Sequence, residues 1–405
     1  MKPSDHATPQ RASAQQRLHH LLLNALVFGL CYPTSNLLAQ QQSNSRHVAT
    51  VLDAHLIFVP WMVLPYLLSG VFFVASFWVV GSMDALRVLS QRLLLATVLA
   101  CLVFVLYPLH FSFVRPALTS PLWAPLYAAL GVLDRPYNQL PSLHVVYCVV
   151  FWSAWRPLCV GRLQKAALLL TLGLVAAATL FTYQHHVLDG VAGALLGWAC
   201  VRVVQPQRQE PWVALYYALG AGVVFVVGMA WWPLWLMLYG VASLLLVARA
   251  YAVGDTHFLH KTRGGFAWWV WLLYAPYLLG YRLTWLCVQW RERRYAPFVQ
   301  MGPGLWVGRR LNNAQARLLP PDCTVVDLAN ELSETPLLRT QRYHCVPLLD
   351  LVTPGKADVE QVLATVHGAL QSGQCVYLHC AMGYRRSRQM AEAYLARYSQ
   401  TAVGA

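Results

Sequence analysis

The feature that most constrains this fold is a series of long apolar stretches. They lie at about 21–39, 58–80, 92–111, 142–157, 166–184, 187–205, 212–230, 233–250 and 266–289. A helix needs about 20 apolar residues to cross the hydrocarbon core of a bilayer. Only 11% of the 405 residues are charged, whereas a soluble domain carries about 25%. We therefore expect an all-α polytopic membrane bundle, with two or three hydrophobic segments after residue 206.

The net charge of +14 fits either binding to nucleic acid or orientation in a membrane. In integral membrane proteins, excess Lys and Arg collect in cytoplasmic loops, so we expect no nucleic-acid partner. If each stretch crosses once, most basic residues fall on one side, from Lys2 and Arg11 to Lys261 and Arg263. The pattern predicts a multi-pass protein of the cell inner membrane with that side in the cytoplasm.

The last apolar stretch breaks this pattern. Arg282 interrupts 266–289, and the basic run RERR follows at 291–294. A charged side chain is costly inside a membrane. We therefore expect a shallow or re-entrant segment here, which keeps the C-terminal domain in the cytoplasm.

The ten cysteines show no paired spacing, and Cys31, Cys101, Cys148, Cys200 and Cys287 fall in apolar stretches. A small disulfide-stabilised scaffold carries its cysteines at a regular spacing. We expect no disulfide framework.

The composition changes after Trp290 to an ordinary content of charged residues. Strand-like runs at 305–308, 324–329, 344–350 and 375–380 alternate with helical patterns at 357–371 and 386–398. This alternation predicts a small α/β domain. The expected organisation is a cytoplasmic leader (1–20), a membrane domain (21–206), additional transmembrane or re-entrant segments (207–290) and the α/β domain (295–405).

The stretch HCAMGYRRS at 379–387 combines residues that suit phosphate chemistry. A strand that ends at Cys380, followed by a short loop and a helix that begins near Arg386, forms a cradle of N–H groups for a phosphate. The same field stabilises a nucleophilic thiolate. Arg386 can bind two phosphate oxygens, Ser387 can donate a hydrogen bond to the thiolate, and Gly383 allows the tight turn.

This segment resembles the dual-specificity branch of the protein tyrosine phosphatase superfamily over about 300–400. The resemblance implies that Cys380 is the nucleophile and that an aspartate in an upstream loop is the general acid. Asp350 lies 30 residues before the cysteine and is the expected acid. Asp358 is the alternative, although its place at the start of a helix favours a first-turn charge. Two further acidic residues, Asp327 and Glu331, are expected to be structural.

Ionisable residues inside apolar segments indicate functional sites because their burial is costly. One cluster is Pro-Ser-x-His at 141–144, which contains Ser142 and His144, and the other is YQHHVLDG. In the second cluster, His185 and Asp189 lie four residues apart, on one face of a helix. The carboxylate can then polarise the imidazole into a nucleophile, and His144 can protonate the leaving alkoxide. Both clusters fall on the predicted non-cytoplasmic face.

Residues 20–206 resemble the type 2 phosphatidic acid phosphatase superfamily, whose core is a six-helix membrane bundle. The resemblance implies that His185 is the nucleophile, Asp189 its partner and His144 the general acid. Arg115, in the sequence FVRP, and Ser142 would bind the phosphate. His186 and His110 are expected to be packed, hydrogen-bonded residues, whereas Tyr137 and Asn138 either line the site or shape the turn.

Two positions depart from the superfamily pattern. Pro108 stands where a lysine is expected, and Ala178-Thr179 replaces a Ser-Arg pair. These differences resemble the branch that contains inositol phosphorylceramide and sphingomyelin synthases, so either water or a lipid alcohol could accept the phosphoryl group.

The sequence therefore predicts a membrane-bound phosphoric monoester hydrolase with two sites and no metal or cofactor. The expected substrates are phospholipids or other lipid phosphates, and phosphoproteins. A headgroup phosphotransferase with an accessory phosphatase domain is the first alternative. A non-catalytic membrane anchor for a protein phosphatase is the second. The sequence leaves the oligomeric state open.

Overall fold

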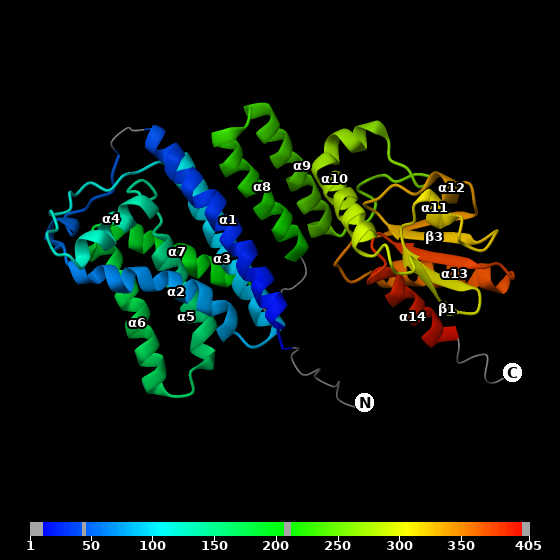
Figure 1. The fold of residues 1–405 in the computed structure, drawn as a ribbon, viewed down its shortest axis with the longest axis horizontal. Helices are drawn as coiled ribbons and strands as arrows, with labels where there is room; N and C mark the ends of the chain where they lie inside the picture. The colour runs from blue at the N-terminus through cyan, green and yellow to red at the C-terminus, as the bar shows by residue number, and fades with distance from the viewer. Residues whose placement is uncertain (1–10, 43–45, 206–211, 399–405) are drawn as a thin grey trace. The chain divides into compact units, whose positions relative to one another are not determined.

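Six helices are long and apolar enough to cross a membrane among residues 11–42, 46–205 and 212–398, which the computed structural model describes (Figure 1). They are α1 (Ala14–Gln41), α2 (Val63–Val79, extended by the turn at Pro60–Met62), α3 (Met83–Leu106), α6 (Arg162–Phe181), α8 (Trp212–Trp231) and α9 (Leu234–Val253). Each overlaps a stretch that the sequence predicted. Their length and composition are compatible with a multi-pass membrane protein.

The chain divides into two units, one of residues 1–209 and 219–241 and the other of residues 210–218 and 242–405. In the first unit, α1 begins seven residues before the predicted apolar stretch. Ser13 and Gln16 cap its first turn in both directions, which satisfies N–H groups that a helix end leaves unpaired. Residues 1–10 of the predicted leader, which include Lys2, lie outside the described part of the chain.

Two shorter helices of the first unit, α5 (Leu143–Trp155) and α7 (Val187–Val203), pack against each other. The sequence predicted full crossings here, but the helices have 13 and 17 residues. They approach closely at glycines: a Cβ on Gly193 would lie 2.6 Å from the carbonyl oxygen of Ser142. A Cβ on Gly197 would lie 3.0 Å from the carbonyl oxygen of Val146. Small residues allow such contact between helix backbones.

The remaining elements of the first unit are short. They are the turns at Asp53–His55 and Arg156–Leu158 and helix α4 (Trp123–Leu133). Helix α4 lies in the Pro-rich connection between the third and fourth apolar stretches.

The second unit contains a five-stranded sheet in the order β1-β2-β5-β3-β4 (Figure 1). The strands are β1 (Phe298–Gly302), β2 (Leu305–Arg309), β3 (Thr324–Ala329), β4 (Tyr343–Leu348) and β5 (Val376–Cys380). Only the β1–β2 pair is antiparallel. The prediction of a C-terminal α/β domain is confirmed. Strand β1 was not predicted.

Helices cover both faces of this sheet. Helices α13 (Lys356–Gln371) and α14 (Arg386–Tyr398) pack on the face that carries Val326 and Leu378. The short helices α11 (Asn313–Ala316) and α12 (Pro336–Arg339) pack on the face that carries Val325 and Tyr377. Adjacent residues point to opposite faces, as the strand period of two requires.

The unit with the sheet also contains residues upstream of 295, where the sequence placed the domain boundary. Helix α10 (Trp268–Arg291) and the loop before it belong to it. The Nζ atom of Lys261 in this loop lies 2.6 Å from Oδ2 of buried Asp327. On α10, the indole N–H of Trp285 donates to the carbonyl of Arg310. Helix α10 is not among the six helices that qualify as membrane spans.

One disulfide is present in this unit, although the cysteine spacing indicated no disulfide framework. Cys323 and Cys375 form a disulfide. They precede the neighbouring parallel strands β3 and β5, in which Thr324 is paired with Val376. The pair is 52 residues apart in sequence, so only the strand register reveals it.

Candidate active sites

The cysteine site lies at the end of the central strand. β5 runs between β2 and β3 and ends at Cys380. A loop then leads into α14, which begins at Arg386. The Sγ atom of buried Cys380 lies 3.4 Å from Oγ of Ser387, which also donates to the carbonyl of Gly308. The structure thus places the predicted hydroxyl beside the predicted nucleophile.

The loop between Cys380 and Arg386 is shaped by Gly383. This residue has φ +76°, and a Cβ there would lie 2.8 Å from the backbone nitrogen of Arg309. Both facts require glycine. In the described part of the chain, the N–H groups of residues 382–385 have no protein acceptor. They remain free to bind an anion.

Arg386 is buried and held by a carboxylate. Both of its terminal nitrogens bond to Glu331, and Nη1 also donates to the carbonyl of Leu348 at 2.8 Å. Burial disfavours the charged form, but Glu331 and Asp350 outweigh it and hold the pKa of Arg386 well above its usual value. The sequence predicted a structural role for Glu331 but not its contact with Arg386. Its place shortly after β3, at the sheet edge where β5 also ends, was the available signal.

Asp350 follows β4 and reaches the same edge. Its Oδ1 lies 3.3 Å from Nε of Arg386, and its Oδ2 accepts a hydrogen bond from the Tyr281 hydroxyl at 3.1 Å. The structure therefore brings Asp350 and Arg386 together, as the sequence predicted. Asp358 lies in the first turn of α13, where a carboxylate complements the helix dipole. Tyr281, on α10, was not predicted from the sequence.

The histidine before the nucleophile belongs to a buried ionic network. Nε2 of His379 lies 2.7 Å from Oε2 of Glu334 and 3.8 Å from Oδ1 of Asp327. Burial tends to lower the pKa of His379, but Glu334 and Asp327 outweigh it and raise that pKa. The three side chains lie close enough to hold a metal ion. The ammonium of Lys261, 2.6 Å from Asp327, already supplies positive charge there.

The histidine site of the first unit is built around the start of α7. Nδ1 of His185 lies 3.5 Å from Oδ2 of Asp189, and both side chains are buried. The backbone N–H groups of Gln184 and His185 donate to the carbonyl of Thr179, at the end of α6. The N–H of Ser142 donates to the carbonyl of Asp189 at 3.0 Å. These bonds join α5, α6 and α7 at the site.

His144 faces His185 from the first turn of α5. The two ring centres lie 6.3 Å apart, and the ring of Tyr66 lies 4.1 Å from that of His144. The buried hydroxyl of Ser142 has no hydrogen-bond partner among the described residues. The structure thus brings together the two histidines and the serine that the sequence proposed.

Arg115 approaches the site through the chain that precedes His185. Its Nε donates to the carbonyl of Thr182 at 3.1 Å and its Nη2 to that of Tyr183 at 3.4 Å. Its guanidinium lies over the ring of Tyr127. Arg115 is therefore bonded to carbonyl groups that lie three and two residues before His185, the proposed nucleophile.

His144 is among the residues that line a cavity of about 440 Å³. Its walls are mainly apolar and include Phe28, Leu67 and Phe73. At the polar end, Asp134 accepts hydrogen bonds from the hydroxyls of Tyr32 and Tyr66. Asp134 was not predicted from the sequence. An aspartate just after a long apolar run was the only available signal.

Other polar residues near the site have structural partners. His186 packs on Phe111, and its Nε2 lies 2.9 Å from Oγ of Ser112. Its backbone N–H donates to Asp189, which fixes that carboxylate. Asn138 donates to the carbonyl of Tyr32 on α1, so it shapes the turn before α5.

A scan against protein-family models, a search of curated proteins and a search of solved structures each found no match. The two resemblances therefore depend on the residues described above.

Proposed function

We propose that this chain is a membrane phosphoric monoester hydrolase with two sites, one based on Cys380 and one on His185. The observation that carries the proposal is the convergence at one sheet edge of Cys380, Arg386 and Asp350. These three groups are a nucleophile, a phosphate-binding cation and an acid. The free N–H groups of residues 382–385 complete a cradle for the phosphate.

At the cysteine site, the thiolate of Cys380 attacks phosphorus, and the bond from phosphorus to the alcohol oxygen breaks. Asp350 donates its proton to the departing oxygen. Water then attacks the thiophosphate, Asp350 takes a proton from that water, and the thiolate of Cys380 leaves. Arg386 binds two phosphate oxygens throughout, and Glu331 holds the guanidinium in place.

At the histidine site, a nitrogen of His185 attacks phosphorus, and His144 protonates the alkoxide that leaves. Asp189 orients the imidazole through Nδ1. Arg115 and the unpaired hydroxyl of Ser142 bind phosphate oxygens. The mainly apolar cavity that His144 helps to line suits the hydrocarbon part of a lipid substrate.

Transfer of a phospho-headgroup between lipids is the second candidate function. Thr179 stands where the superfamily has an arginine, and its buried hydroxyl donates to the carbonyl of Ala176, so this position supplies no cation. Few cations and an apolar cavity favour a lipid alcohol over water as the acceptor.

A product assay on purified full-length protein tests both functions. Radiolabelled phosphatidic acid, phosphatidylglycerophosphate and phosphopeptides would be supplied, each with and without a second lipid alcohol. Hydrolysis releases free phosphate, whereas transfer yields a labelled second lipid. Absence of both products with every substrate would contradict the proposal.

We further propose that the His185 site faces away from the cytoplasm and that the Cys380 site faces the cytoplasm of a bacterial-type inner membrane. The distribution of basic residues favours this arrangement. The disulfide between Cys323 and Cys375 favours an oxidising compartment and argues against it.

Labelling of intact cells with a membrane-impermeant maleimide decides whether the sheet domain lies inside or outside the cytoplasm. In a variant in which exposed Cys287 is replaced by serine, a cysteine at Thr119 should react and one added at the C-terminus should not. Reaction of the C-terminal cysteine in unbroken cells would place the sheet domain outside the cytoplasm.

A further inference from the structure

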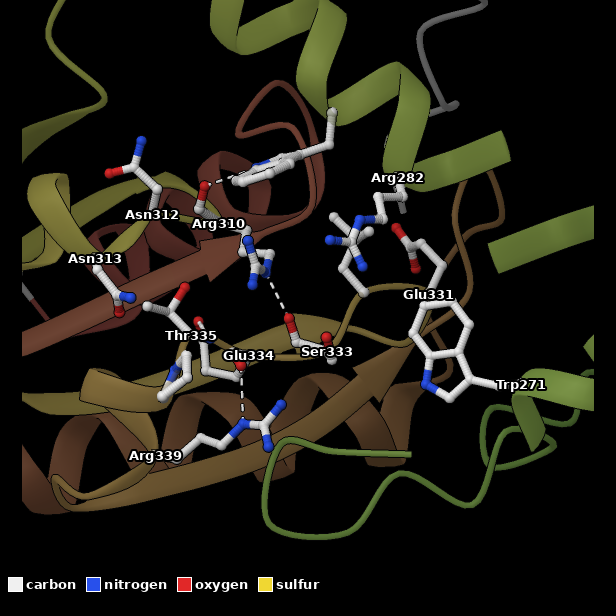
Figure 2. A pocket seen from close by; sticks show the side chains of 13 residues that line it. Trp271, Arg282, Arg310, Asn312, Asn313, Glu331, Ser333, Glu334, Thr335 and Arg339 are labelled. Atoms are coloured by element: carbon white, nitrogen blue, oxygen red, sulfur yellow. Dashed lines mark hydrogen bonds between the residues drawn. The ribbon is translucent and has the colours of Figure 1, made fainter. Parts of the chain in front are cut away.

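A second cavity, which is polar and has a volume of about 310 Å³, lies in the unit that contains the sheet (Figure 2). Helix α10 forms part of its wall through Trp271, Arg282 and Trp285. The segments that follow β2 and β3 form the rest and include Arg310 and Asn313. Cys380 does not line this cavity. It is a separate candidate binding site.

Three guanidinium groups line the cavity, and among the described residues none is paired with a carboxylate. Nε of Arg310 donates to the carbonyl of Ser333, and its guanidinium stacks on Trp285 at 4.5 Å. Nε of Arg339 donates to the carbonyl of Glu334 at 2.8 Å (Figure 2). These bonds fix two of the guanidiniums while leaving most of their N–H groups free. Arg282 has no hydrogen bond to another described residue.

Two carboxylates also line the cavity, but each has a basic partner outside the three arginines. Glu331 is paired with Arg386. Glu334 lies 2.7 Å from Nε2 of His379. The positive charge of the three remaining arginines is therefore not cancelled locally.

Two side-chain amides add neutral donors. Oδ1 of Asn312 accepts a hydrogen bond from the N–H of Gln315 at 2.9 Å, which leaves its NH₂ group available. Asn313 is exposed and lines the same cavity (Figure 2). Several guanidiniums beside amide donors suit a phosphate group, because arginine binds phosphate oxygens with two parallel hydrogen bonds.

The outer face of α10 indicates where the phosphate comes from. Eight large apolar side chains on this helix are exposed: Trp268, Trp269, Leu272, Leu273, Leu279, Leu283, Leu286 and Trp290. The helix is kinked at Tyr274. After the kink, the last four of these side chains follow one another at spacings of three and four residues, which places them on one stripe, opposite the buried residues Tyr277 and Val288. A helix with an apolar stripe and terminal tryptophans lies at a membrane surface. Arg282 extends from this helix into the cavity.

We propose that this cavity binds the phosphate of an anionic phospholipid headgroup while the apolar stripe of α10 contacts the same membrane surface. The site does not use Cys380 and does not depend on the proposed hydrolase activity. Free phosphate shares the same chemistry, so the test must separate the two sources.

The test measures the affinity of detergent-solubilised full-length protein for two probes, dihexanoyl phosphatidylglycerol and inorganic phosphate, by calorimetry. Arg282→Gln removes one guanidinium, and Asn313→Asp adds a negative charge with almost no change of shape. Each should weaken phosphatidylglycerol binding roughly five- to tenfold, as expected for one basic residue at an anionic lipid. Arg317→Gln, at an exposed arginine of the same domain outside the cavity, is the matched control and should leave the affinity unchanged.

The two probes distinguish the outcomes. Phosphate bound at Cys380 is common to all variants and cancels in the comparison. Weakening for inorganic phosphate without any for phosphatidylglycerol would overturn the lipid assignment, and equal affinities in all variants would overturn the site. Unchanged circular-dichroism spectra and melting temperatures would show that the variants are folded.

Discussion

The two candidate active sites, both proposed to hydrolyse phosphoesters, differ in the number of charged groups that they contain. The cysteine site is rich in ions: Arg386 is buried between Glu331 and Asp350, and His379 lies in a second network with Glu334. At the histidine site, Oδ2 of Asp189 lies 3.5 Å from Nδ1 of His185 and 3.6 Å from Nδ1 of His186, and Arg115 is bound to backbone carbonyls.

This difference follows from the surroundings of each site. Charges are costly among apolar helices, so a site there keeps few and depends on neutral donors such as Ser142. The sheet edge can hold more ions because backbone carbonyls and opposite charges compensate them. The comparison predicts that the cysteine site acts on soluble phosphoesters and the histidine site on lipid substrates.

The largest expected effect separates the two nucleophiles. Cys380→Ser should reduce hydrolysis of p-nitrophenyl phosphate to background, because serine lacks an activated thiolate. His185→Ala should leave this activity intact and abolish release of phosphate from lipid phosphates. Initial rates with both substrates on the full-length variants provide the measurement.

If a single nucleophile served both substrates, the proposal of two separate sites would be wrong. It would appear as equal losses in Cys380→Ser and His185→Ala while circular dichroism shows both variants folded.

The next effect tests the acid of the cysteine site. Asp350→Asn should lower turnover of alkyl phosphates about 100-fold or more, the usual contribution of a general acid. Aryl phosphates should lose much less, because phenolates leave without a proton. Full pH–rate profiles on both substrate types make the measurement.

Asp358→Asn is the matched control and should have little effect, since Asp358 lies in the first turn of α13. Equal losses of Asp350→Asn on alkyl and aryl phosphates would assign the acid role elsewhere.

The sequence predicted the residues grouped at the cysteine site better than it predicted the residues that hold them in place. Cys380, Gly383, Arg386 and Ser387 lie in one short motif, so local pattern was enough. Strand β3 was predicted with its observed bounds, 324–329. Glu331 and Tyr281 were missed because they reach Arg386 and Asp350 only through the packing of separate segments.

In the membrane region, the sequence predicted the helices but not how they pack. Apolar stretches predicted its helices, but not that α5 and α7 would be shorter than the predicted crossings. Length and hydropathy do not reveal which helices pack closely against each other. Asp134 was missed because its two tyrosine partners come from α1 and α2.

A substitution that disturbs the close approach of α5 and α7 should lower the rate with lipid phosphates about tenfold. Gly193→Ala would place a methyl group 2.6 Å from the carbonyl oxygen of Ser142, so the helices must separate and His144 must move from His185. Displacement by about 1 Å can cost about 100-fold in rate, and partial relaxation should leave about a tenfold loss with lipid phosphates. Activity on p-nitrophenyl phosphate should not change.

The control for this substitution is Gly173→Ala on α6, where a Cβ would meet no atom within 4 Å. A normal lipid activity in Gly193→Ala would show that the histidine site does not depend on this helix contact.

The smallest effect concerns the pH dependence of stability, to which the sheet domain should contribute through His379, a buried histidine with a raised pKa. Folding favours protonated His379, since Glu334 and Asp327 outweigh its burial. Its contribution to the free energy of unfolding is therefore fully present below the ordinary histidine pKa of about 6.5. It is lost as the pH rises through the higher pKa of the folded state.

The melting temperature of the full-length protein should accordingly fall by a few degrees as the pH rises from about 6.5 through that folded-state value. Glu334→Gln removes the main favourable charge and should flatten this dependence. Glu360→Gln, whose partner is the exposed Arg397, should not. The same slope in Glu334→Gln as in the unmodified protein would mean that His379 is neutral in the folded state, and the ionic network of the cysteine site would then be smaller than the distances indicate.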